Sequence, residues 1–202
     1  MAAYPTVSAP YGFKPVNRID GLPYAGAIRQ VPISGSYNVA IYNGDPVKIV
    51  TGGTIERTAA SGAVTSGTIL GIFVGCQYVN SSGQTVQAQY YPGTAVTNAV
   101  AYVVDDPFAV FKVAVAYANA AVTTVTQAAV GTNMSFNMGT GSATTGDSGA
   151  FVTAASGANT ATLPFRVVAV VPETATSATT FCEVIVKTNL QQYNDNLGNN
   201  LS

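Results

Sequence analysis

Short apolar runs, separated by turns rich in Gly, Pro, Asn and Ser, recur along most of the chain. The clearest succession predicts three strands, at residues 47–50, 54–58 and 69–76. In the first, Val47 and Ile49 lie on one face of the strand, because side chains alternate across it. The third run, ILGIFVGC, is apolar on both faces, which predicts a central place in the core. Its glycines indicate a bulge or a close backbone approach.

Further segments with alternating or continuously apolar positions are also expected to be strands. They are residues 27–31, 37–42, 72–79, 85–91, 100–104, 109–115, 133–138, 149–152, 165–171 and 181–187. The turn at 80–83 predicts an antiparallel hairpin, with Val86, Ala88 and Tyr90 facing inward. Residues 123–130 are the helix candidate, which Gly131 would end.

Strands that recur about every ten residues predict an all-β fold. We expect a β-barrel or sandwich of many short antiparallel strands, with one short helix and an extended N-terminal arm. The arm comprises residues 1–24, where recurring prolines disfavour helix. It either lies as a strap across a neighbouring molecule or packs on its own domain. Residues 25–189 form the β-rich domain, and residues 190–202 are a polar tail with little to bury.

Charge is scarce in this chain of 202 residues: 8% are charged and 48% are apolar, with a formal net charge of −1. The basic residues are scattered singly, so no basic stripe is available to neutralise phosphates, and nucleic-acid binding is not expected. A surface poor in charge promotes association. This favours a role in an assembly over the alternative, a β protein that only associates non-specifically. Neither a secretory signal nor an apolar run of bilayer length is present, so we expect a soluble protein made in a cytoplasm, with no membrane partner.

Residues 146–149 spell Gly-Asp-Ser-Gly, the nucleophile motif of trypsin-like proteases. The chain has no histidine to accept the serine proton, so we interpret the motif as a turn within a mobile loop at 139–149. Asp105 and Asp106 precede a proline and are interpreted as turn residues, not as paired catalytic or metal-binding carboxylates. Cys76 and Cys182 lie in apolar strands and are expected to be buried free thiols. We therefore predict no enzymatic activity, no catalytic residue, no cofactor and no metal site.

Several short motifs resemble structural proteins of tailed bacteriophages, particularly marine and cyanobacterial ones. They are PYGFKPVN at 10–17, YNGDPV at 42–47, ILGIFVGC at 69–76, QYYP at 89–92 and AYVVDDP at 101–107. A turn followed by a GD-x-V strand and an ILGI-x-V-G strand is also similar to phage head decoration proteins. Proteins of that class are small β domains that sit as trimers on the outer capsid and cement the shell.

The resemblance implies a non-enzymatic virion structural protein, made in the host cytoplasm and placed on the capsid exterior. Its partners would be the major capsid protein and further copies of the chain, most simply as a trimer. We expect the arm to make the capsid contacts, with Tyr11 and Phe13 as anchors and with Lys14 or Arg18 meeting acidic capsid groups. Three alternatives remain: a tail, spike or portal-associated part, a carbohydrate-binding β-sandwich, and a hydrolase. The missing tryptophan and histidine argue against the last two.

Overall fold

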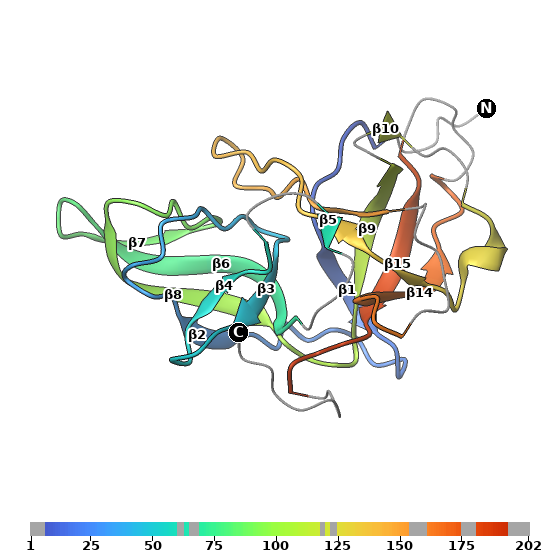
Figure 1. The fold of residues 1–202 in the computed structure, drawn as a ribbon, viewed down its shortest axis with the longest axis horizontal. Coiled ribbons are helices and arrows are strands. Elements are labelled where there is room, and N and C mark those ends of the chain that lie inside the picture. The colour runs from blue at the N-terminus through green and yellow to red at the C-terminus, as the bar shows by residue number, and fades with distance from the viewer. Residues whose placement is uncertain are drawn as a thin grey trace.

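The computed structural model describes residues 7–59, 63–64, 69–117, 120–121, 125–153, 161–174 and 181–193. These residues form two β-sheets that lie side by side, each with its own apolar core (Figure 1). The prediction of an all-β fold of many short, mainly antiparallel strands is confirmed.

The first sheet is organised around the long strand β9. Its nine described strands are β1 (Lys14–Arg18), β5 (Ala63–Val64), β9 (Ala109–Tyr117), β10 (Ala120–Ala121), β11 (Asn133–Met134), β12 (Phe136–Asn137), β13 (Phe151–Thr153), β14 (Phe165–Val170) and β15 (Glu183–Thr188). The main path runs β11-β14-β15-β9-β13-β12-β5, and β1 and β10 also pair with β9. The pairing of β13 with β9 is parallel, whereas β1 and β15 pair with β9 in the antiparallel direction.

The second sheet is organised around β6. Its six described strands are β2 (Arg29–Pro32), β3 (Pro46–Ile49), β4 (Ile55–Arg57), β6 (Gly71–Asn80), β7 (Thr85–Ala88) and β8 (Val96–Val104). The order is β2-β8-β6-β3-β4, and β7 pairs with β6 as the predicted hairpin, with Tyr78 opposite Val86. The predicted alternation in β7 and after it is confirmed, because Val86, Ala88 and Tyr90 are half-buried and the glutamines between them are exposed.

The apolar run before and within β6 contributes to both cores. Ile69 and Ile72 belong to the core of the first sheet, whereas Leu70, Phe73 and Cys76 belong to the core of the second. Its central place was predicted from apolar residues on both faces, and the structure confirms it. Both predicted roles of its glycines are also found. The register with β8 shifts between Phe73 and Gly75, and a Cβ on Gly71 would collide with the Val104 carbonyl.

Three predicted elements differ from the structure. Among the described residues, the expected helix is a single 3-10 turn, Gln127–Ala129, whose N-cap Thr126 makes no side-chain cap hydrogen bond; residues 123 and 124 lie outside the described part. Residues 37–42 pair only at an isolated bridge, because the Tyr42 N–H donates to the Asp45 carboxylate instead of a neighbouring strand. Residues 133–138 form two strands, β11 and β12, which pair with different partners.

The described part of the arm belongs to the β domain. Strand β1 pairs with β9, with Lys14 opposite Lys112, and Phe13 is fully buried in the core of the first sheet. Residues 7–24 therefore pack on their own domain, which was one of the two interpretations of the arm. Residues 1–6 lie outside the described part.

The start of the polar tail is also buried, contrary to expectation. The Gln191 Nε2 donates to the carbonyls of Leu70 and Asp105, and the Gln192 side chain both accepts from and donates to the Ile49 backbone. Amide side chains can satisfy backbone groups in this way, although the Gln191 Oε1 is buried without a hydrogen-bond partner in the described part of the chain. The chain thus crosses from β15 of the first sheet to the second sheet before residue 194, where the described part ends.

Candidate functional site

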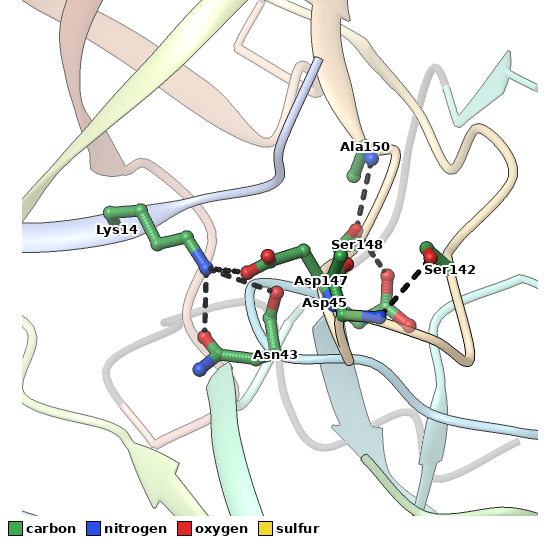
Figure 2. Close-up of polar contacts among 8 residues, drawn as sticks. Lys14, Asn43, Asp45, Ser142, Asp147, Ser148 and Ala150 are labelled. Atoms are coloured by element: carbon green, nitrogen blue, oxygen red, sulfur yellow. Dashed lines mark hydrogen bonds and ion pairs between the residues drawn. The ribbon is translucent and has the colours of Figure 1, made fainter. Parts of the chain in front are cut away.

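The Gly-Asp-Ser-Gly motif lies where the two sheets meet, against the turn that precedes β3 (Figure 2). The Ser148 N–H donates to the Asn43 carbonyl, and the Asn43 N–H donates to the Gly146 carbonyl. Within the loop, the Ser142 N–H donates to the Asp147 carbonyl. Residues 142–148, part of the loop expected to be mobile, are therefore fastened by backbone hydrogen bonds at several points.

Ser148 closes a buried polar cluster with Asp45 and Arg57. Its hydroxyl donates to Asp45 Oδ1 at 2.6 Å and accepts from the Ala150 N–H at 2.9 Å. Asp45 Oδ2 lies 2.8 Å from Arg57 Nε and 2.8 Å from the Tyr42 nitrogen. Burial raises the pKa of Asp45, because the cost of removing the carboxylate from water exceeds the stabilisation by Arg57 and by the hydrogen bonds.

This geometry gives Ser148 a structural role. Its hydroxyl proton is committed to a carboxylate, the residue is only 2% exposed, and the sequence holds no imidazole to activate it. The motif was interpreted as a turn, but the turn lies just before it, at residues 143–145, and Asp147 forms an isolated β-bridge with Asn43. The motif therefore connects the two sheets.

Two glycines allow three segments to meet backbone to backbone at this junction. Gly12 has a φ of 82°, and a Cβ there would lie 2.7 Å from the Ser148 Cβ. Gly44 has a φ of 98°, and a Cβ there would lie 2.9 Å from the Phe13 nitrogen. Any other residue at either position would be strained and would separate the segments. The approach permits the Phe13 N–H to donate to the Gly44 carbonyl at 3.0 Å.

Lys14 reaches into the same junction from β1. Its Nζ lies 2.7 Å from Asp147 Oδ1, 3.2 Å from Asn43 Oδ1 and 3.5 Å from the Asn43 carbonyl oxygen (Figure 2). Lys14 was predicted to meet acidic groups of another protein. The acidic group that it meets in the structure is Asp147 of its own chain.

Tyr11 and Phe13, the two predicted anchors, face inward. The Tyr11 hydroxyl donates to Glu183 Oε1, and burial, together with that carboxylate, raises the pKa of Tyr11. The Phe13 ring stacks on Phe165 at 4.4 Å and meets Phe136 edge-on at 6.1 Å between centroids. The hypothesis that Phe13 contacts a partner is therefore wrong, because its side chain is part of the core.

Arg18 is the one predicted contact residue beside an exposed apolar surface. Ile19, Leu22 and Phe108, which we call the outer patch, are between 44% and 57% exposed. They are held together by hydrogen bonds from the Ile19 N–H to the Phe108 carbonyl and from the Arg18 N–H to the Leu22 carbonyl. The Arg18 guanidinium lies 5.5 Å from the Phe108 ring centroid and forms ion pairs with Asp20 and Asp106. Val16 and Ile28, on the same stretch of chain, are also about half exposed.

The outer patch could have been recognised in the sequence. Ile19 and Leu22 flank Asp20-Gly21 and precede Pro23, and large apolar side chains in such a turn have little chance of burial. Asp105 and Asp106, next to Phe108 in the sequence, behave as predicted for turn residues. The Asp106 carboxylate accepts a hydrogen bond from the Phe108 N–H and forms an ion pair with Arg18. Asp105 forms an ion pair with Arg29.

Other kinds of site were considered over the described residues. In that part of the chain, no three His, Cys, Asp or Glu side chains are grouped in a way that could hold a metal ion. None of its helices has the length and apolar character needed to cross a membrane. Cys76 and Cys182 are buried and free, as predicted.

No family model, curated protein or solved structure matches the chain. The function is therefore inferred from the residues of the chain itself.

Proposed function

We propose that the chain is a non-enzymatic structural protein of a phage virion, which binds the outside of the capsid and cements its subunits. The observation that carries the proposal is the outer patch, a cluster of large exposed apolar side chains on a protein with only 8% charged residues. Exposed apolar clusters on soluble domains mark interaction surfaces. The motif order that resembles head decoration proteins supports the same role.

We move the proposed contact from the start of the arm to the outer patch, which lies at the end of the arm and beside Phe108. Ile19, Leu22 and Phe108 would bury against a capsid subunit; since each is already about half buried, each would contribute roughly half of the 1.5–3 kcal/mol that full burial of a large side chain supplies. Arg18 lies at the edge of the patch with two acidic partners, so it can exchange one of them for an acidic group of the capsid. A trimer would present three such patches, and simultaneous binding would convert weak single contacts into a firm clamp.

The test begins with the number of copies in particles of the virus that encodes the chain. Quantitative mass spectrometry of purified particles is expected to find a number comparable to that of capsid subunits. A few copies per particle would indicate a tail, spike or portal-associated part, and absence from the particle would overturn the proposal.

A second experiment addresses the patch itself. Leu22→Asp is expected to lower loading onto capsids that lack the protein by about tenfold or more, since it removes apolar burial and adds a charge. Gln87→Asp, at an exposed position of β7, is the matched control and is expected to load normally. Equal loading of the two variants would exclude the outer patch as the contact.

A further inference from the structure

Lys14, Asn43 and Asp147 bring an amine, a carboxamide and a carboxylate together at the junction of the two sheets. The Lys14 Nζ lies 3.2 Å from Asn43 Oδ1 and 2.7 Å from Asp147 Oδ1 (Figure 2). The geometry points to an intramolecular isopeptide bond between the Lys14 Nζ and the Asn43 Cγ, formed with loss of ammonia and with Asp147 as the proton carrier. This inference is independent of the proposed function.

The backbone holds the two reacting side chains close to each other. Lys14 lies on β1, paired with β9, and follows the fully buried Phe13. The Phe13 N–H donates to the carbonyl of Gly44, the residue after Asn43, so the two chain segments are already joined one position away. Asn43 is fixed in turn by its hydrogen bonds to residues 146 and 148. The 3.2 Å contact joins the Lys14 Nζ to the Asn43 Oδ1, the oxygen bonded to the reacting Cγ, and the placement of reacting groups next to each other on rigid elements contributes to their rate.

Asn43, and not Asp147, is the acyl group in this arrangement. An ionised carboxylate does not accept an amine, because its charge is delocalised and it forms an ion pair with the ammonium group. A carboxamide is neutral, and its carbon is open to attack. The Asn43 Nδ2, the leaving nitrogen, makes no hydrogen bond to any residue in the part of the chain that the structure describes.

The proposed step conserves atoms and charge. The Lys14 ammonium group first passes a proton to Asp147, which frees the nitrogen lone pair. That lone pair forms the new bond to the Asn43 Cγ, and the Cγ–Nδ2 bond breaks with its electrons on nitrogen. The departing nitrogen takes up the proton from Asp147 and the second Nζ proton lost by the new amide. Lysine ammonium and asparagine thus give an amide and an ammonium ion, with no oxidant or other reactant.

A competing reaction at Asn43 is disfavoured by the same structure. Asparagine followed by glycine can cyclise to a succinimide, and that route also releases ammonia. It requires the Gly44 nitrogen as the nucleophile, but the Gly44 N–H donates to the Phe73 carbonyl at 2.8 Å. The succinimide route therefore requires that hydrogen bond to break first.

The bond would join β1 of the first sheet to the turn that precedes β3 of the second. The linked positions are 29 residues apart, so the bond would close a loop that includes all of β2. Closing a loop of this size restricts the unfolded chain, and the linked protein is expected to unfold at a higher temperature than the unlinked one.

The test is the intact mass of the folded full-length chain, measured after purification and after incubation at neutral and mildly alkaline pH. The expected mass is that of the sequence less one ammonia. Trypsin does not cleave between Lys14 and Pro15, so Lys14 remains in peptide 1–18 and Asn43 lies in peptide 30–48. Tandem mass spectrometry is expected to find these two peptides joined through Lys14 and Asn43.

Two variants make the result specific. Lys14→Arg keeps the cation and its ion pair but lacks the reactive amine, and it is expected to keep the full mass. Asp147→Asn is expected to slow the loss of ammonia, since it removes the proton carrier. The inference is overturned by a full mass of the folded wild-type chain after long incubation. It is equally overturned by ammonia loss that persists in Lys14→Arg, which would be succinimide, or by water loss that joins Lys14 to Asp147.

Discussion

The Ser148 hydroxyl donates a 2.6 Å hydrogen bond to the Asp45 carboxylate, across 103 residues of the chain. Asp45 directly precedes β3 of the second sheet, whereas Ser148 lies shortly before β13 of the first. Both residues are at most 2% exposed, so the bond joins the two sheets through a charged group removed from water. Hydrogen bonds to buried charges are stronger than those between neutral groups, and their loss leaves the charge partly unsatisfied.

Removing this link should destabilise the whole domain. Ser148→Ala is expected to lower the free energy of unfolding by about 1.5–3 kcal/mol, because Asp45 loses a donor and the Ala150 N–H loses its acceptor. Urea unfolding followed by circular dichroism measures the change. Ser82→Ala, in an exposed turn, is the matched control and should stay within about 0.5 kcal/mol of the wild type. Similar values for the two variants would show that the link contributes no stability.

Substitutions of two phenylalanines distinguish the core from the proposed contact surface. Phe13→Ala is expected to cost about 3–5 kcal/mol, because it leaves a cavity between Phe136 and Phe165. Phe108→Ala should change stability by only about 0.5 kcal/mol, since its ring is 49% exposed. Thermal and urea unfolding of both variants provide the comparison. A stable Phe13→Ala variant would contradict the placement of the arm in the core.

Local sequence patterns predicted the strands well where a single strand carried the signal. Period-two alternation placed β7, and apolar residues on both faces placed the start of β6 between the cores. The arm was harder, because its prolines indicated an extended strap. Pro15 is nevertheless compatible with β1. Among the described strands β1 pairs only with β9, so it lies at an edge of the sheet, where proline is tolerated.

The contacts at the junction could not be predicted from local patterns. Lys14, Asp45 and Ser148 meet because the two sheets place distant turns side by side, and no periodicity encodes such a meeting. The missing histidine led to the interpretation of the motif as a turn, but it did not reveal what the serine contacts. The buried glutamines after β15 were missed for a related reason, since polar composition predicts exposure unless the backbone partners are known.

The start of the polar tail should therefore contribute to stability. Gln192→Ala is expected to cost about 1–2 kcal/mol, because both backbone groups of Ile49 lose their partner. Gln87→Ala, at an exposed position of β7, is the control of the same residue type. Hydrogen exchange of the Ile49 amide, followed by NMR, gives a local measure and is expected to accelerate in Gln192→Ala alone. An unchanged exchange rate would show that the tail does not protect β3.

The two thiols should be inert in the folded protein. Cys76 is fully buried, and burial raises its pKa to about 12, so almost none of it is thiolate at pH 8; burial also raises the pKa of Cys182. A thiol reagent at pH 8 is expected to label neither cysteine in the native state and both in guanidinium chloride.

The folded state holds the Cys76 proton more tightly than the unfolded chain does. Its contribution to stability is thus complete below the unfolded pKa of about 8.5 and is lost as the pH rises through about 12. Native labelling at pH 8 that matches the rate in guanidinium chloride would contradict the burial of these strands, and a Cys182→Ala variant would assign any residual reaction to Cys76.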